Sequence, residues 1–534
     1  MNFIKEWCRK YCHQLILVAV SASVLFIHLG LPQVSELMEA RNLQTAREIV
    51  RDGSWLLPTM NGDLRLAKPP LPTWLTAIAA IIGGGFDNLT VLRTPSALAA
   101  IIMVLALYGV CFELTQNRKW ALYAGLILAT SIHWIEMGRE NFWDIYVHAA
   151  MLSAIWCFLK AIRISKARYW WGFGIAMGMS LLCKGPVGYF SLFIPFLAAW
   201  CIALDGITHL KKNWKQVIGS LLIALIIGGA WPIVVSMTNM AAGVGTLNKE
   251  VSSWTSSHVQ PWWFYGHFLF LTGIWMGLGW SILNSSLIRK RLDGKQKLGK
   301  FLLIWIGITL LLLSVMPHKQ MRYLLPIWVP VAMTIGGLWI NMLTKRLLTI
   351  HVIIVLLFSA GATAMLTKAI LDHSITPTEG TLGGMLLWGA TGIVIQYFKK
   401  NNPAGVFYAT VAVVIAFVIG VYPAMAEQIK GQYDYTVLSV LKNNPKLKDI
   451  PFYTTRSRIH MQYVFYAGKE IKLWDPKDAT SWPERLPLII LTIDNPLDLS
   501  EYKGDQSHVK KEELGRYPSQ IGNRQKWIPT LITE

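Results

Sequence analysis

Long apolar stretches separated by short polar segments fill the chain from residue 14 to about residue 424. Each stretch is roughly 17–25 residues long, the length of a helix that crosses a lipid bilayer. The pattern predicts an all-α polytopic membrane protein. Fourteen stretches are candidate spans: 14–31, 70–86, 90–112, 120–136, 145–162, 169–184, 187–204, 216–237, 263–286, 301–316, 323–343, 347–368, 381–397 and 404–424.

The basic loops reduce this number to thirteen. Lys and Arg in short loops should lie on the cytoplasmic side together with the N-terminus. If 70–86 crossed the membrane, every later basic cluster would lie on the opposite side from the N-terminus. Three prolines and the run Gly83–Gly85 also leave 70–86 short and broken at both ends. We therefore expect 70–86 to be a juxtamembrane or re-entrant helix. The clusters are Arg118/Lys119, Arg163/Lys166/Arg168, Lys211/Lys212/Lys215, Arg289–Lys300, Lys345/Arg346 and Lys399/Lys400.

The segment from residue 425 differs in kind from the rest. It mixes short β-like runs, such as LPLIILTI, with charged helix-like stretches. Its length of about 110 residues suffices for one small domain. The chain thus divides into a membrane domain, 1–424, and an α/β domain, 425–534, which thirteen spans place in the periplasm. The localisation expected is the cytoplasmic (inner) membrane, with the N-terminus in the cytoplasm.

Composition agrees with this class. The chain is 53% hydrophobic and 15% charged, against about a quarter charged in soluble proteins. Its net charge of +20 follows from the positive-inside bias, so we expect membrane lipids and not nucleic acid as partners. None of the six cysteines follows Cys201, which leaves the C-terminal domain without a disulfide framework.

The predicted outer loops are charged, although the positive-inside bias should leave them poor in Lys and Arg. Ionisable groups near membrane depth are costly and usually functional. The first loop, from residue 36 to about 89, contains Glu39, and the second contains Asp144. Such a set of cations with a few carboxylates suits an anionic, lipid-linked substrate. The cations are Arg41, Lys68, Arg139, Lys184, Lys319 and Arg322.

Each of these residues also has a plainer interpretation. A single Lys or Arg can anchor lipid headgroups. Asp144 can cap the helix that follows it. Glu39 can pair with an arginine on an amphipathic surface helix over 36–51, and His258, close to Trp262, can belong to an interfacial aromatic belt. Their joint occurrence on one side of the membrane is what favours a site.

The motifs of these loops occur in a recognisable order. An acidic first loop leads into G-x-W-x-x-P-x-x-N-G, then K-P-P-L-x-x-W. Asp144 at a helix start, K-G-P at 184–186, an H-x-x-P-W loop and K-x-x-R-Y-x-L-P follow. This set resembles the C-type-fold membrane glycosyltransferases that use polyprenyl-phosphate sugars, in particular the 4-amino-4-deoxy-L-arabinose lipid A transferases. Protein O-mannosyltransferases are more distant relatives.

The resemblance implies roles for individual residues. Glu39 and Asp144 are expected to be catalytic, and Lys68 is expected to bind the donor phosphate. We add Arg41 and Arg322 to the phosphate ligands. The remaining polar outer residues are expected to line the substrate cavity: Arg139, Lys184, Lys319, Tyr323 and His258.

Two positions depart from the family pattern. Relatives hold Asp-Glu where this chain has Met38-Glu39. Transfer to a hydroxyl benefits from a base, whereas a phosphate oxygen is already anionic, so the change favours an acceptor that needs little base. In relatives, a histidine matching His258 shares a structural zinc with a glutamate, which is Ala67 here. No metal or other cofactor is therefore predicted.

The expected activity is transfer of a sugar from undecaprenyl phosphate to an outer-leaflet acceptor, lipid A or a related glycolipid. A protein hydroxyl or another surface glycan is an alternative acceptor, with Glu39 as the base. A lipid or solute transporter is an alternative from another class, but the chain lacks the internal repeat of many transporters, and its polar groups lie in loops instead of at mid-span. A structural scaffold would not need cations gathered on the outer side.

Overall fold

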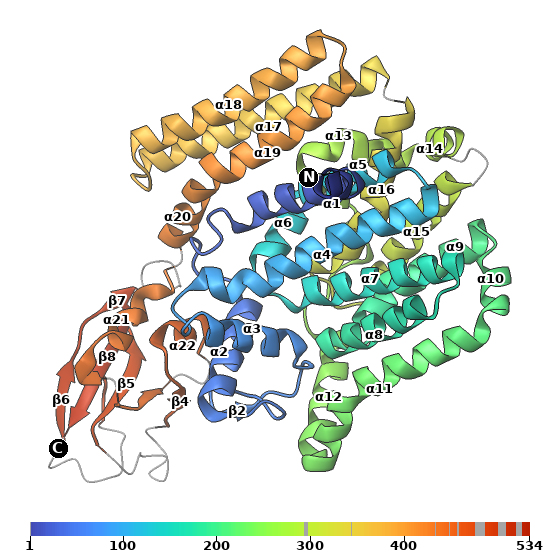
Figure 1. The fold of residues 1–534 in the computed structure, drawn as a ribbon. Coiled ribbons are helices and arrows are strands. Elements are labelled where there is room, and N and C mark those ends of the chain that lie inside the picture. The colour runs from blue at the N-terminus through green and yellow to red at the C-terminus, as the bar shows by residue number, and fades with distance from the viewer. Residues whose placement is uncertain are drawn as a thin grey trace.

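The computed structural model describes residues 2–292, 297–342, 344–432, 434–447, 449–455, 459–475, 486–499, 509–518 and 526–533. Over these residues the protein is a layered assembly of long helices with a small β-sheet at one end (Figure 1). The predicted fold class, a polytopic helical membrane protein with a C-terminal α/β region, is confirmed.

Nine helices in the described part of the chain are long and apolar enough to cross a membrane, and a bent pair, Tyr189–Ala203 with Gly206–Lys212, would make ten. The other predicted spans are helical but short, broken or less apolar, so the number thirteen stays a prediction. The nine are α4 (Leu89–Thr115), α7 (Trp143–Ile164), α11 (Trp214–Thr238), Trp262–Leu283 (η2 to η4), α15 (Leu298–Val315), Met321–Asn341 (η5 and α16), α17 (Lys345–Leu371), α18 (Pro377–Lys399) and α19 (Pro403–Gly420). The remaining helices of this region are α1 (Asn2–Phe26), α2 (Leu37–Asp52), α3 (Leu71–Ile82), α5 (Arg118–Ala129), α6 (Ile132–Arg139), α8 (Ala167–Lys184), η1 (Tyr189–Phe193), α9 (Ile194–Ala203), α10 (Gly206–Lys212), α12 (Met240–Ser256), α14 (Ser285–Leu292) and α20 (Tyr422–Gln432).

Helix α3 occupies the stretch that the basic loops excluded as a span. It has 12 residues, which is about 18 Å of helix and too short for a hydrocarbon core of about 30 Å. Pro70 and Pro72 set its start and Gly83 its end. The helix packs beside α2 in the first loop, together with a small hairpin of β1 (Thr59–Met60) and β2 (Asp63–Leu64). Its length agrees with a juxtamembrane helix.

The C-terminal residues form a mixed sheet with strand order β4-β3-β5-β8-β6. Strand β5 is buried along most of its length because LIILTI is apolar on both faces. It pairs in parallel with β3 and antiparallel with β8. The elements are η6 (Thr436–Leu438), α21 (Ser439–Lys442), η7 (Pro445–Leu447), β3 (Phe452–Thr454), α22 (Met461–Ala467), β4 (Ile471–Leu473), β5 (Leu488–Ile493), β6 (Lys510–Glu513), β7 (Tyr517–Pro518) and β8 (Lys526–Thr533). The predicted boundary at 424/425 lies inside α20.

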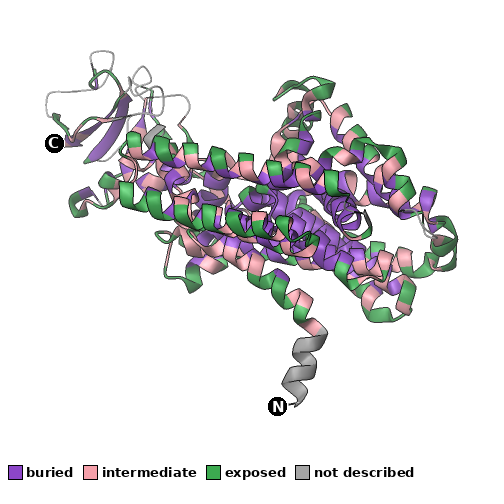
Figure 2. Ribbon diagram, turned by 90° about the horizontal axis from the view of Figure 1, so that it is seen from above, coloured by how far each residue is buried: buried purple, intermediate pink, exposed green. Residues whose placement is uncertain are grey.

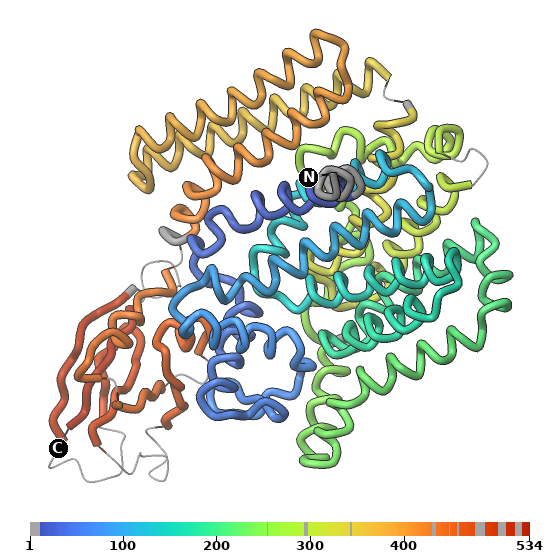
Figure 3. Tube along the Cα trace, viewed as in Figure 1, coloured from blue at the N-terminus to red at the C-terminus, as the bar shows by residue number. Residues whose placement is uncertain are grey.

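The sheet and its helices, here called the C-terminal domain, pack on the first loop although some 400 residues separate them in sequence (Figure 3). Arg47 of α2 donates a hydrogen bond to the Phe465 carbonyl of α22 (2.8 Å). Its guanidinium lies over the Phe465 ring, 4.5 Å from the centroid. The first loop is therefore held between the helices and the domain.

Burial is concentrated in the interior of the helical region, whereas the outer faces of the helices are exposed (Figure 2). Helices α10 and α14, which carry predicted cytoplasmic basic residues, lie at the end opposite to the sheet (Figure 1). The two ends thus differ in kind, one having short basic helices and the other the first loop and C-terminal domain.

Candidate active site

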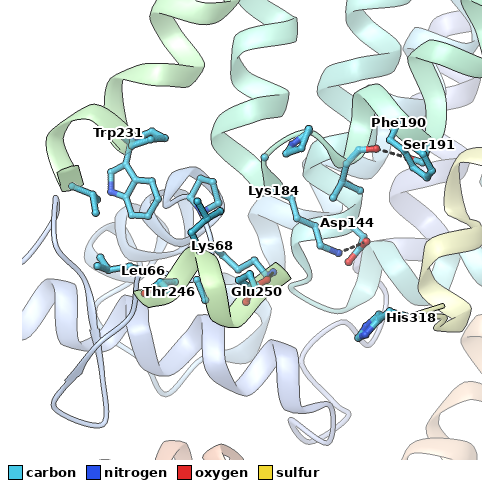
Figure 4. A pocket seen from close by; sticks show the side chains of 18 of the residues that line it. Leu66, Lys68, Asp144, Lys184, Phe190, Ser191, Trp231, Thr246, Glu250 and His318 are labelled. Atoms are coloured by element: carbon cyan, nitrogen blue, oxygen red, sulfur yellow. Dashed lines mark hydrogen bonds and ion pairs between the residues drawn. The ribbon is translucent and has the colours of Figure 1, made fainter. Parts of the chain in front are cut away.

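A cavity of about 770 Å³ lies near the first loop, where the start of α7, the end of α8 and the helices α11 and α12 converge. Figure 4 shows Lys184 directed toward Asp144 and Lys68 beside Glu250, with Trp231 and Leu66 at the left of the view. The cavity therefore combines a charged end with apolar walls.

Asp144 and Lys184 form the first polar pair of the cavity. Asp144 lies in the first turn of α7, and Lys184 is the last residue of α8, just before the Gly185–Pro186 turn. The Lys184 Nζ donates to Asp144 Oδ1 at 2.6 Å, and both side chains are more than nine-tenths buried. Arg322 Nε lies 3.8 Å from the other carboxylate oxygen. Asp144 is therefore an ion-pair acceptor and not merely a helix cap. We call this group, Asp144 with Lys184 and Arg322, the floor of the cavity.

A buried histidine supports this floor from one turn further along α7. His148 Nδ1 lies 2.7 Å from the Asp144 carbonyl oxygen, and its Nε2 lies 3.1 Å from Ser191 Oγ. Both side chains also line the cavity. These contacts fix the first turn of α7 against the segment that follows Lys184.

The second polar pair joins Lys68 to Glu250 of α12, with Nζ 2.8 Å from Oε2. Lys68 directly precedes Pro69 and Pro70, whose ring-fixed backbone turns the chain into α3. None of the residues of α12 whose exposure is described is buried. Helix α12 thus has no buried residue among those described, yet its Glu250 carboxylate reaches into the cavity and pairs with Lys68.

The apolar wall lies beside this pair. Trp231 and Val235 of α11 form a cluster with Leu66, and Val244 and Leu247 of α12 also line the cavity. Such a wall can hold a hydrocarbon chain while the charged end holds an anion. The arrangement suits a lipid phosphate.

Comparison with known proteins shows similarity to transferases whose names include a lipid-phosphate sugar donor. Residues 67–231 match the family described as dolichyl-phosphate-mannose-protein mannosyltransferase. The undecaprenyl phosphate-α-4-amino-4-deoxy-L-arabinose arabinosyl transferase of Pectobacterium atrosepticum is 23% identical over 417 residues, covering 72% of this chain and 70% of that protein. A transferase of the same name from Proteus mirabilis is 26% identical over 309 residues, covering 55% and 53%.

A solved structure extends the likeness to the whole chain. ArnT from Cupriavidus metallidurans, bound to undecaprenyl phosphate, has a TM-score of 0.70 at 15% identity, with 96% of this chain and 97% of that one covered. The chain therefore has the C-type fold of that transferase.

The structure places Glu39 outside the cavity. Both of its carboxylate oxygens accept hydrogen bonds of 2.8 Å from the Arg93 guanidinium, and Oε1 also accepts from the backbone N–H of Asn141 at 3.1 Å. Its side chain is 1% exposed. The predicted position of Glu39 in the catalytic cavity is therefore wrong, because its acceptor capacity is used to tie α2 to α4 and to the segment before α7.

Arg41 and Arg139 also lie elsewhere than expected. Arg139 is buried and donates to the carbonyls of Val24 and Leu25, with its guanidinium over the Tyr422 ring. It is thus a contact between α6 and α1, and not a cavity residue. Arg41 lines a different cavity, between the first loop and the C-terminal domain.

Lys319 and His258 belong to the loops that border the site. Lys319 donates to the carbonyls of Gln260 and Met316, which ties two loops together instead of leaving its charge for a ligand. His258 is exposed, with its ring 5.3 Å from that of His318. Neither residue lines the cavity, so both predictions are corrected; of the two neighbouring histidines, His318 reaches it and His258 does not.

Four predicted residues do meet at the cavity. Lys68, Asp144, Lys184 and Tyr323 line it, and Lys184 Nζ lies 5.0 Å from the Tyr323 ring centroid. Arg322 is not among the lining residues, but its charge reaches Asp144. The Lys-Gly-Pro turn and the Lys-Pro-Pro turn were the sequence signals for the two lysines.

Glu250 and His148 were missed. The helix α12 lies between the candidate spans 216–237 and 263–286, where hydropathy predicted no element. His148 lies inside an apolar span and was not singled out; its position one turn after Asp144 was the available signal.

The residues at the expected zinc position do not suit a metal. Ala67 offers only a methyl group, and the His258 ring faces His318 instead of an acidic side chain. Within the described residues, no group of three or more His, Cys, Asp or Glu side chains is placed to hold a metal ion.

Arginines of the first loop carry unbalanced charge near the cavity. Burial lowers the pKa of Arg65 to about 10, and the charge of Arg41 acts in the same direction. Burial and the charge of Arg322 lower the pKa of Arg41. Because Glu250 is the carboxylate that opposes both shifts, this region favours binding of a further anion.

Proposed function

We propose that this glycosyltransferase moves a sugar from undecaprenyl phosphate to a glycolipid on the outer leaflet of the inner membrane, with lipid A or a related lipid as the acceptor. The observation that carries the proposal is the meeting, in one cavity, of Lys68 with the apolar wall of α11 and α12. The donor in the names of the relatives, undecaprenyl phosphate carrying 4-amino-4-deoxy-L-arabinose, has this same combination of chain and phosphate.

The chemistry follows from charge movement. The bond between the anomeric carbon and the phosphate oxygen breaks, and its electron pair stays on the phosphate, which gains a negative charge. Lys68 is placed to stabilise that charge. A lone pair of the acceptor oxygen forms the new bond to the anomeric carbon.

The surroundings of the carboxylates favour an acceptor oxygen that is already anionic. Among the described lining residues, Asp144 and Glu250 are the carboxylates of the cavity, and each is paired with a lysine. An ion-paired carboxylate is a weak base. Because Glu39 is fixed on Arg93, a phosphate oxygen is a better acceptor for this site than a hydroxyl, whose proton would need a base.

Donor binding replaces one anion by another. Glu250 occupies Lys68 in this structure, so the donor phosphate has to take the place of its carboxylate. Asp144, held by Lys184, remains on the floor and is assigned to the sugar, whose amine or hydroxyls can donate to it.

The orientation of the chain is part of the proposal. We assign the end that carries α10 and α14 to the cytoplasm, together with the N-terminus, and the C-terminal domain to the periplasm. The basic residues of α10 and α14 support this assignment. Labelling of cysteines introduced at exposed Lys399 and Lys472 with a membrane-impermeant reagent tests it, since only the second should react in intact spheroplasts.

The activity is tested by mass spectrometry of lipid A from cells with and without the protein, and by transfer with purified protein in nanodiscs. Lipid A should lose a single-sugar increment without the protein. Lys68→Met should abolish transfer, whereas Lys399→Met, at an exposed lysine of α18, should not. Unchanged lipid A would overturn the acceptor, and full transfer by Lys68→Met would overturn the phosphate site.

A further inference from the structure

A second cavity, of about 1120 Å³, lies between the first loop and the C-terminal domain. One wall is formed by α2 and the β1–β2 hairpin, and the other by the end of β3, the start of α22 and strand β4. Nothing in the proposed donor chemistry uses this space.

The two walls are fixed relative to each other. Asn61 of the hairpin exchanges hydrogen bonds with Ile471 of β4, donating from Nδ2 to the carbonyl (2.9 Å) and accepting at Oδ1 from the N–H (2.8 Å). Gln462 of α22 donates to the Ser35 carbonyl at 2.7 Å, and Arg51 pairs with Glu470. The cavity is therefore preformed, as ligand pockets usually are.

Its lining differs from that of the donor cavity. Its lining includes the carboxylates of Asp52, Asp63 and Glu470 and the cations of Arg41 and Lys472. Sugar hydroxyls both donate and accept hydrogen bonds, so a mixture of carboxylates and cations suits a glycan. Methionine and leucine side chains can cover its C–H faces: Met60, Met461 and Leu473.

Among the described residues, Arg41 is a cation of this lining without a carboxylate partner. Its Nη1 donates to the Met38 sulfur at 3.6 Å, and its buried Nε has no hydrogen-bond partner within the described part of the chain. Asp52 and Glu470 are instead paired with Arg51. Arg41 also interacts electrostatically with Arg322 and Glu250, which belong to the donor side. An anion bound by Arg41 would therefore lie between the two cavities.

We propose that this interdomain cavity binds the headgroup of the acceptor, a phosphorylated glycolipid, with Arg41 holding one of its phosphates. The inference rests on the proposed function and deepens it, because it assigns the acceptor to a site separate from the donor. It also reassigns Arg41 from the donor phosphate to the acceptor. The C-terminal domain then contributes to acceptor recognition through β4 and α22.

Two variants test the site in different ways. Arg41→Gln removes the charge, and Leu473→Trp fills the cavity from a side chain that is 58% exposed. Both should raise the KM for lipid A by about tenfold, the scale of one lost charge-assisted hydrogen bond. Neither should change the affinity for undecaprenyl phosphate. The matched controls are Arg346→Gln and Leu371→Trp, at exposed positions of α17 outside both cavities.

Lipid A without its phosphates separates the contribution of charge from that of shape. The wild-type protein should use it poorly, and Arg41→Gln should use it no worse than wild type, whereas Leu473→Trp should still impair it. Equal KM for lipid A in all variants would overturn the inference while leaving the proposed function standing. A wild-type protein that binds undecaprenyl phosphate but transfers nothing to lipid A would instead overturn the proposed acceptor. Should Arg41→Gln not fold, Leu473→Trp decides alone.

Discussion

The anchor of the first loop and the floor of the donor cavity each contain a buried carboxylate paired with a cation, and they differ in what surrounds the pair. At the anchor, Glu39 receives two hydrogen bonds from Arg93, whose remaining donors reach the carbonyls of Leu29 and Pro32. At the floor, Asp144 receives one short hydrogen bond from Lys184, and Arg322 lies 3.8 Å away.

The difference indicates a structural role for the anchor and capacity for a ligand at the floor. A fully satisfied buried network holds one arrangement and has no capacity left for a ligand. An incompletely satisfied group keeps donors and acceptors for a substrate, and Arg322 Nε has no hydrogen-bond partner among the residues that the structure describes. The floor can therefore exchange partners during a reaction, and the anchor cannot.

The largest effect is expected when each carboxylate is neutralised in turn. Asp144→Asn should lower kcat/KM for sugar transfer by about a hundredfold, the scale of losing one positioned electrostatic group, with a small change in Tm. Glu39→Gln should do the reverse, lowering Tm and leaving the activity of the folded fraction near wild type. Transfer assays and thermal unfolding on the same preparations measure both. Loss of activity in Glu39→Gln at unchanged Tm would restore a chemical role for Glu39.

The sequence predicted one member of this pair of regions better than the other, for a physical reason. Asp144, Lys184 and Lys68 stand beside turns whose motifs are local, so their approach to the cavity could be expected. The partner of Glu39 lies 54 residues away inside α4, and a tertiary ion pair leaves no local pattern. Glu39 and Arg139 are the same residue types as the residues predicted to bind substrate, and only their partners distinguish them.

Secondary structure, too, could be predicted where the sequence signal was local. Hydropathy located the long apolar helices, and charge parity singled out α3, whose 12 residues could otherwise have been counted as a span. Helix α12 was not predicted because hydropathy locates bilayer-length apolar stretches, and the 17 residues of α12 are amphipathic and do not form one. Glu250 of α12 reaches the cavity through its ion pair with Lys68, and the composition of the segment does not predict such a pair.

The next largest effect concerns the stability of the anchor. Arg93→Met leaves Glu39 buried without its cation, which should destabilise the protein by roughly 3–5 kcal/mol. Adding Glu39→Leu removes the unpaired charge and should recover much of that loss. Denaturant titration of the two variants measures the difference. A double variant as unstable as Arg93→Met would show that the backbone contacts of Arg93, and not the ion pair, hold the first loop.

A smaller and opposite effect is expected in the donor cavity. Glu250→Gln removes the carboxylate that competes with phosphate for Lys68, so undecaprenyl phosphate should bind severalfold more tightly. The pair is partly exposed, with side chains 19% and 30% accessible, which keeps the expected gain modest. Titration of the lipid into nanodisc-embedded protein measures it, with Lys249→Gln as the neighbouring control on α12. Weaker binding by Glu250→Gln would mean that Glu250 orients Lys68 for the ligand instead of competing with it.

The smallest expected effect concerns the pH dependence of stability near the anchor. Glu140 follows α6 directly, close to the anchor, and burial together with the charges of Glu39, Glu36 and Glu136 raises its pKa well above the usual value of 4.5. A carboxyl with a raised pKa in the folded state favours folding when protonated. Its contribution is therefore complete below pH 4.5 and is lost as pH rises through the higher folded-state value. Glu140→Gln keeps the neutral form at every pH, so its Tm should fall less than that of wild type as pH increases across neutrality. A parallel fall of both proteins would place the pH-sensitive group elsewhere than at Glu140.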